Sequence, residues 1–268
     1  MTGDRQLDPN EATRVLERIR RALDLADEVL KNYTPGAIDS RKKSGGDPVT
    51  EADLAVDKAL RESLLQEGDG WLSEETADDP ARLKCRRVWV VDPIDGTREF
   101  VSGIPEWCVS IGLVEDGEPV AGGQLNRAAG HLILGVPGFG VTINHAPGRA
   151  TDRETLAGAT VLASRTEVGR GEWKRFEGAS FTVRPMGSVA YKLGLVGAGL
   201  ADATWTLVPK HEWDVAAGVA LIRAGGGDAR TLDGRPPLFN QPKPKLTGLI
   251  AAGPRLIGPI LSYLQIPG

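Results

Sequence analysis

Cysteine, aromatic residues and long apolar runs are all scarce in this chain of 268 residues. The two cysteines, Cys85 and Cys108, are too few for a disulfide framework, and we expect both thiols to be reduced. No apolar segment approaches the ~20 residues that span a bilayer. Residues 1–18 are polar and acidic and lack the layout of a signal peptide. We therefore expect a cytoplasmic protein without a membrane partner.

An excess of charge of one sign is also absent. The chain has 32 basic and 36 acidic residues, so its net charge is −4. This balance does not provide the basic surface that binds nucleic-acid polymers. The hydrophobic fraction of 41% is typical of a globular protein. The chain is long enough to bury a substantial core in one large or two medium domains.

The first third of the sequence indicates two amphipathic helices. Between Glu11 and Lys31 the apolar residues recur at three- and four-residue steps, which predicts a helix. A second helix is predicted from Glu51 to Gln66, with Thr50 as its N-cap. The apolar run Val88–Val91 then predicts a strand that is buried on both faces.

The period of the sequence changes after residue 100. An antiparallel meander is predicted from the strand-like segments Trp107–Glu115, Glu118–Leu125 and His131–Val136. Residues 138–153 predict loops and contain the expected boundary between a domain of residues 1–145 and a domain of residues 146–268. Beyond it, strands and helices alternate. The predicted strands are Thr160–Ala163, Phe181–Arg184, Ala203–Val208 and Leu246–Ala251, and the predicted helices are Val189–Gly199, Asp214–Ala224 and Pro254–Leu264. This order indicates an α+β first half and an α/β second half.

The most informative segment is Asp92-Pro93-Ile94-Asp95-Gly96-Thr97, which directly follows the predicted strand Val88–Val91. Ligands of α/β proteins usually bind at the carboxyl ends of strands. Two carboxylates on one short turn repel each other unless a cation lies between them, and Mg²⁺ prefers such oxygen ligands. Turns are also rich in Asp and Gly for structural reasons, so this segment alone leaves both interpretations open.

Three further acidic motifs accompany this segment: Thr50-Glu51-Ala52-Asp53, Ser73-Glu74-Glu75 and Trp213-Asp214-Val215-Ala216-Ala217-Gly218. Each alone is typical of a helix cap or a solvated surface. Together with residues 92–97, they closely resemble the inositol monophosphatase superfamily of metal-dependent, lithium-sensitive phosphatases. The resemblance extends over about residues 10–265. It implies a layered αβαβα sandwich and a homodimer.

The resemblance also implies a role for each matched residue. The implied ligands of two or three Mg²⁺ ions are Glu74, Asp92, the Ile94 carbonyl, Asp95 and Asp214. The implied catalytic residues are Asp53, Glu74 and Thr97, with Asp53 holding the threonine that activates the attacking water. The implied substrate contacts are Asp95, Gly96, Thr97, Ser188, Lys192 and Asp214.

Elementary chemistry is consistent with these implied roles. Hydrolysis of a phosphate monoester needs charge neutralisation, a positioned water and a stabilised leaving oxygen, and a pair of Mg²⁺ ions supplies all three. Proton relay from Thr97 to Asp53 requires only hydrogen-bond reach. A non-catalytic cation- or phosphate-binding module is the alternative from another class, but it would have no use for this pair.

The motifs that bear on the substrate are mixed. Residues 72–75 and 97–100, together with Lys192, resemble 3′(2′),5′-bisphosphate nucleotidases, whereas residues 103–105 and 109–113 are more similar to inositol or histidinol phosphatases. We expect a bisphosphate nucleotide as the substrate (adenosine 3′,5′-bisphosphate converted to AMP), with inositol 1-phosphate as the alternative. Lys192 is the candidate for the second phosphate, and a solvated position for it is equally open. The same choice is open for Lys42, Lys43, Arg98 and His211. Asp47 stands where many members have serine, which affects only the local loop.

Overall fold

The computed structural model describes residues 7–42 and 48–267. The two long helices of the first third begin at side-chain caps. Helix α1 (Pro9–Leu30) begins where the Asp8 carboxylate accepts two backbone N–H groups. Helix α2 (Glu51–Leu64) has Thr50 as its N-cap, as predicted. Within the described part of the chain, no helix is long and apolar enough to cross a membrane.

A seven-stranded sheet forms the centre of the first half. Its order is β3-β4-β5-β6-β7-β8-β9. Strands β3 and β4 pair in parallel, and every later neighbour pairs antiparallel, which confirms the predicted meander. The strands are β3 (Gly70–Ser73), β4 (Arg87–Asp95), β5 (Cys108–Glu115), β6 (Glu118–Asn126), β7 (His131–Val136), β8 (Gly140–Ile143) and β9 (Ala146–Gly148).

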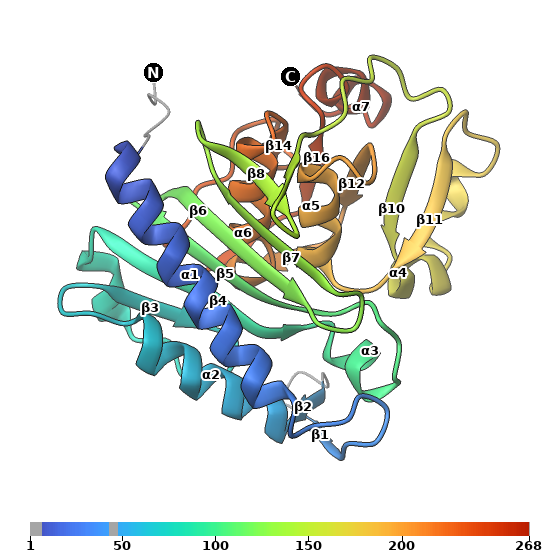
Figure 1. Ribbon diagram of the computed structural model, residues 1–268. Helices are drawn as coiled ribbons and strands as arrows, with labels where there is room; N and C mark the ends of the chain where they lie inside the picture. The colour runs from blue at the N-terminus through green and yellow to red at the C-terminus, as the bar shows by residue number, and fades with distance from the viewer. Residues whose placement is uncertain (1–6, 43–47, 268) are drawn as a thin grey trace.

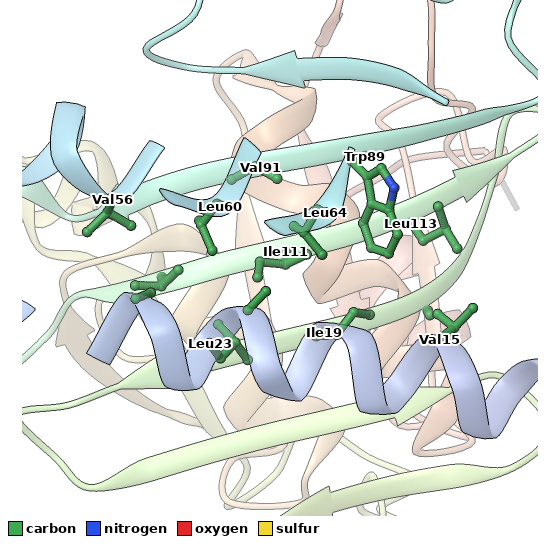
Figure 2. Packing of buried hydrophobic residues seen from close by; sticks show 14 of the residues in the cluster. Val15, Ile19, Leu23, Val56, Leu60, Leu64, Trp89, Val91, Ile111 and Leu113 are labelled. Carbon is green, nitrogen blue, oxygen red and sulfur yellow. The ribbon is translucent and has the colours of Figure 1, made fainter. Parts of the chain in front are cut away.

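Alternation along β4 divides the core between the two faces of this sheet. Trp89 and Val91 point to the face that α1 and α2 cover, where they pack among residues such as Ile19 and Leu60 (Figure 2). Val88 and Val90 belong to the cluster on the opposite face. Because both faces are covered, the strand is buried on both sides, as its unbroken apolar run predicts.

The second half builds a mixed five-stranded sheet, in the order β11-β10-β12-β16-β14. Its strands are β10 (Thr160–Ser164), β11 (Thr182–Met186), β12 (Ala203–Thr206), β14 (Asp228–Arg230) and β16 (Leu249–Ala252). Two small ladders join β1 (Ser40–Lys42) to β2 (Pro48–Thr50) and β13 (Lys210–His211) to β15 (Lys245–Leu246). The remaining helical segments are α3 (Thr97–Val101), α4 (Arg165–Gly169), α5 (Val189–Gly197), α6 (Glu212–Ala224), α7 (Ile257–Tyr263) and the 3₁₀ turns η1 (Pro80–Lys84) and η2 (Glu172–Phe176).

Helices and sheets stack in five layers (Figure 1). Helices α1 and α2 cover the outer face of the seven-stranded sheet, and α5 and α6 lie between the two sheets. Strand β16 again divides two clusters, because Leu249 and Ala251 face α5 and α6 while Ile250 and Ala252 pack with α7. The arrangement confirms the expected αβαβα sandwich.

The structure differs from the sequence-based expectations at short strands. Residues 138–153, predicted as loops, contain the short strands β8 and β9, which are partly exposed and whose glycine and proline content is typical of loops. The polar edge strand β14 was not predicted either. The single strand expected at Leu246–Ala251 is two strands, β15 and β16, that pair with different partners. The division into domains at residue 145 stays a prediction, and the first sheet continues to Gly148.

Two glycines bring helix α6 against the seven-stranded sheet. Gly112 of β5 and Gly122 of β6 are directly paired neighbours. A Cβ atom on Gly122 would lie 2.5 Å from the carbonyl oxygen of Ala217, and a Cβ atom on Gly112 would lie 2.8 Å from the backbone nitrogen of Ala217. The helix backbone therefore touches the strands directly, and Ala216 and Ala217 of the sequence motif are the small residues that this contact requires.

We expect Gly122→Ala to lower the free energy of unfolding by roughly 1–3 kcal/mol, because the added methyl group must push α6 away from the sheet. Chemical denaturation measures this change. Gly258→Ala is the matched control, since nothing lies within 4 Å of a Cβ atom there. Equal stability of the two variants would contradict the proposed close packing.

Candidate active site

The acidic segment lies at the carboxyl end of β4. The ladder with β5 is irregular between Asp92 and Asp95, so the strand bulges where the two carboxylates stand. Gly96 follows with φ of 97°, and a Cβ atom there would lie 2.9 Å from the carbonyl oxygen of Glu106. Only glycine fits this turn, which ends the strand and begins helix α3 at Thr97.

Helix α6 brings the third carboxylate from the other half of the chain. Asp214 is its third residue and accepts a hydrogen bond from the His211 backbone N–H at 2.9 Å, which caps the helix. Because α6 is seated on the glycine pair of the sheet, its first turn reaches the end of β4. One oxygen each of Asp92, Asp95 and Asp214 lies within 4.8 Å of the others.

Hydrogen bonds fix the orientation of each of these carboxylates. The Ile94 N–H donates to Asp92 Oδ1 at 3.1 Å. The Ser188 hydroxyl donates to Asp95 Oδ2 at 2.6 Å, and the Ala190 N–H donates to the same oxygen. Partners of this kind orient ligands around a metal ion and leave other lone pairs for it.

Burial and mutual repulsion make the cluster electrostatically unfavourable. Desolvation and the neighbouring charges of Glu74 and Asp95 raise the pKa of Asp92 well above its ordinary value. The same causes raise the pKa of Asp214 to about 8. Converging, buried oxygen donors of this type fit a hard divalent cation, whose charge would favour the ionised forms.

Glu74 and the Ile94 carbonyl lie beside the three aspartates. Glu74 follows β3, its backbone N–H approaches the Val91 carbonyl at 3.4 Å, and its side chain lines the same cleft. The Glu74 charge raises the pKa of both Asp92 and Asp214, which shows that it acts on the cluster. The Ile94 carbonyl accepts from Thr97 Oγ1 at 3.0 Å.

The structure brings Thr97 and Asp53 together across 44 residues of sequence. Thr97 Oγ1 lies 3.1 Å from Asp53 Oδ1. The other oxygen, Asp53 Oδ2, accepts from the Thr50 backbone N–H at 2.8 Å and from the Thr50 hydroxyl at 2.6 Å. The capping box of α2 therefore fixes the carboxylate and directs one oxygen at Thr97.

Lys192 lies in the cleft wall but is not solvated. Its ammonium donates to the carbonyl oxygens of Ser188 (2.8 Å), Gly187 (3.3 Å) and Met186 (3.4 Å). Burial lowers the pKa of Lys192 to about 8, although the nearby Asp95 opposes this shift. Ser188, with φ of 53°, holds an uncommon backbone conformation that these bonds stabilise.

The remaining sequence candidates divide into two groups. Arg98 lines the cleft, and the His211 ring, also in the lining, stacks on Trp213 with centroids 4.3 Å apart. Lys43 and Asp47 lie outside the described residues, as does the side chain of Lys42.

Sequence reasoning missed Glu167 and Lys210, which line the cleft on the side of the second sheet. Glu167 is buried, accepts from the Thr206 hydroxyl at 2.7 Å and from Trp173 Nε1 at 3.2 Å, and lies 3.8 Å from Lys210 Nζ. A signal was available, because Ser164-Arg165-Thr166-Glu167 follows the predicted strand Thr160–Ala163 just as residues 92–97 follow the predicted strand Val88–Val91.

Most of these groups line one cleft of about 580 Å³ between the halves of the chain. Its lining combines Glu74, Asp95, Asp214 and Thr97 with cationic side chains, while Asp92 and Asp53 are buried behind it. Such a set can hold a divalent cation, position a water and accept an anion.

A model of the inositol monophosphatase family matches residues 9–263. The chain belongs to this family. It is 36% identical over 244 residues to the inositol-1-monophosphatase SuhB of Mycobacterium tuberculosis, covering 84% of this chain and 80% of that protein. Its fold is similar to that of the Thermotoga maritima IMPase, with a TM-score of 0.78 and 25% identity, covering 93% of this chain and 97% of the other. It is also similar to CysQ from Bacteroides thetaiotaomicron, with a TM-score of 0.74 and 26% identity, covering 90% and 97%.

Without divalent cations and at pH 8 or above, we expect Asp92→Asn to raise the melting temperature, because the change removes a buried carboxyl group whose ionisation is opposed by burial and by its acidic neighbours. Carboxyl pKa values raised in the folded state, such as that of Asp214 near 8, mean that folding takes up protons. The stability of the metal-free parent should therefore rise as the pH falls from about 8 toward 5, and the advantage of the variant should shrink.

Thermal denaturation in chelator and in excess Mg²⁺ measures both effects. Mg²⁺ should stabilise the parent and stabilise Asp92→Asn far less. Asp152→Asn, at an exposed carboxylate, is the control and should behave as the parent does. A variant that is less stable in chelator, or equally stabilised by Mg²⁺, would contradict the electrostatic account of the cluster.

Proposed function

We propose that the protein is a Mg²⁺-dependent phosphomonoesterase whose substrate is a small polyol monophosphate, with inositol 1-phosphate as the first candidate. The observation that carries the proposal is the juxtaposition of the three-aspartate cluster with the Thr97–Asp53 hydrogen bond beside a cleft that Asp95, Thr97 and Asp214 line. Membership of the inositol monophosphatase family and the names of its relatives support it.

The cation would be held by Asp92, Asp95, Asp214, Glu74 and the Ile94 carbonyl, and two or three ions per site remain part of the proposal. When bound, Mg²⁺ supplies positive charge that neutralises phosphoryl oxygens and promotes deprotonation of water. Sensitivity to lithium is likewise proposed from the family.

Thr97 and Asp53 provide a path for the proton of the attacking water. The Thr97 hydroxyl has one hydrogen and two acceptors within reach, Asp53 Oδ1 and the Ile94 carbonyl. When this hydrogen points to Asp53, the lone pairs of Thr97 Oγ1 accept a hydrogen bond from a water. As the water oxygen attacks phosphorus, its proton passes to Thr97, whose own proton passes to Asp53. The ester P–O bond breaks, the leaving alkoxide takes a proton from a solvent water, and Asp53 returns its proton to the hydroxide that remains.

The turn at Gly96 and Thr97 is the proposed contact for the phosphoryl group. Gly96 brings the backbone close to the cleft, and both residues line it. Ser188 contacts Asp95 rather than open space, so its proposed part is to orient that carboxylate beside the substrate.

The bisphosphate nucleotide stays the second candidate. The sequence motifs favour it, and Arg98, Arg165 and Lys210 line the cleft as cations. The residue on which the nucleotide hypothesis depended, Lys192, donates instead to three main-chain carbonyls. The polyol monophosphate needs no second anion site and is therefore the first candidate. A homodimer stays a prediction.

Thr97→Ala should lower kcat by ~10²-fold or more while leaving the Mg²⁺ dependence of the remaining activity unchanged, because the change removes the proton path and no metal ligand. Thr97→Ser keeps the hydroxyl and should retain most of the activity. Steady-state rates at several Mg²⁺ concentrations test this assignment. It is wrong if Thr97→Ala weakens Mg²⁺ activation but keeps kcat.

Kinetics on two substrates test the choice of substrate. We expect kcat/KM for inositol 1-phosphate to exceed that for adenosine 3′,5′-bisphosphate. Lys192→Met should reduce both values by a similar factor, because the ammonium supports the turn at residues 186–188. A preference of the unsubstituted protein for the nucleotide would favour the nucleotidase instead. So would an increase in KM in Lys192→Met that is confined to the nucleotide.

A further inference from the structure

A buried arginine outside the cleft lining, Arg82, joins the two halves of the chain. The Arg82 side chain is 1% exposed. Its Nε and Nη2 donate to the two carboxylate oxygens of Asp78, at 2.6 and 2.9 Å. Its Nη1 donates to Asn240 Oδ1 at 2.7 Å, and Nη2 also donates to the Gln241 carbonyl at 3.0 Å. Asn240 Nδ2 returns a bond to the Arg82 carbonyl at 3.2 Å.

The loop that contains Asn240 and Gln241, the partners of Arg82, also binds the first residue of helix α6. The fully buried Glu212 accepts from the Asn240 N–H at 2.7 Å and from the Gln241 N–H at 3.0 Å. The Glu212 N–H donates to the Pro244 carbonyl at 3.0 Å. Three bonds thus fix the start of α6, and Asp214 is two residues further on.

On its other side, Arg82 is attached to the strand that precedes Glu74. Arg82 belongs to the turn η1, which packs on β3. A Cβ atom added to Gly70 of β3 would lie 3.0 Å from Cβ and 3.2 Å from Cα of Arg82. Strand β3 ends at Ser73, immediately before Glu74. A continuous set of contacts therefore connects the segments that carry Glu74 and Asp214.

We propose that Arg82 is a positioning residue of the metal centre: through Asn240, Gln241 and Glu212 it fixes Asp214 relative to Glu74 and so sets the affinity for Mg²⁺. This inference rests on the proposed function. A buried charge network contributes little net stability compared with apolar packing, whereas the planar guanidinium fork fixes its partners in direction. Loss of a direct hydrogen-bond partner of a metal ligand typically weakens metal binding by about 10–100-fold, and for Arg82, which acts through Glu212, we expect the lower end of this range.

The test compares Mg²⁺ binding by Arg82→Met, Asn240→Gly and Arg223→Leu in the full chain. Asn240→Gly removes the side-chain bonds to Arg82 and keeps a residue that tolerates the φ of 55° found there. Arg223→Leu is the matched control, because it breaks the 2.6 Å ion pair with Glu118 at the opposite end of α6. Binding of Mg²⁺ alone is measured by calorimetry and by tryptophan fluorescence, and kcat is measured at saturating Mg²⁺.

We expect Arg82→Met to raise the Kd for Mg²⁺ about tenfold or more, Asn240→Gly to raise it in the same direction, and Arg223→Leu to leave it unchanged. At saturating Mg²⁺, kcat should recover in both site variants. An unchanged Kd in Arg82→Met, or an equal increase in Arg223→Leu, would overturn the inference alone. If Arg82→Met does not fold, Asn240→Gly decides in the same way. Absence of Mg²⁺ binding by the unsubstituted protein would overturn the proposed function and, with it, this inference.

Discussion

The repulsion among Asp92, Asp95 and Asp214 is the interaction on which the rest of the structure depends. Bringing three carboxylates within 4.8 Å in a buried site is unfavourable, and the raised carboxyl pKa values express this. The fold opposes the repulsion with rigid attachments: a bulged strand end, a capped helix and a glycine pair that seats this helix on the sheet. A bound cation would convert the same arrangement from a source of strain into a binding site.

The sequence predicts the layers of the fold well because alternation and helical periods are strong over long elements. Strand β4 illustrates this, because its unbroken apolar run predicts a strand covered on both faces. Trp89 and Val91 lie in the core on one face, and Val88 and Val90 lie in the core on the other. Short edge strands carry too little pattern. In β8 and β9, glycine, proline and exposed positions resemble loops, and only pairing with a neighbour makes them strands.

The site divides in the same way. Its acidic residues lie in short motifs whose chemistry is local, so they could be predicted as a set, whereas the contacts that decide their roles are tertiary. The direction of the Lys192 ammonium depends on the strained turn at Ser188, and no pattern in the helix shows it. Arg82 was invisible for the same reason, because its partners Asn240 and Gln241 are 158 and 159 residues away.

Helix α2 shows how a local folding signal also prepares chemistry. A capping box needs an acceptor at its third residue, and Asp53 meets this need with one oxygen through Thr50. These bonds also fix the direction of the second oxygen, Asp53 Oδ1, and Thr97 Oγ1 lies 3.1 Å from it. Because the helix would lose the Asp53 half of its capping box if the carboxylate turned away, the orientation of the proposed base is tied to the stability of the helix. The geometry for proton transfer thus follows from an interaction that forms at the start of α2 whether or not substrate is present.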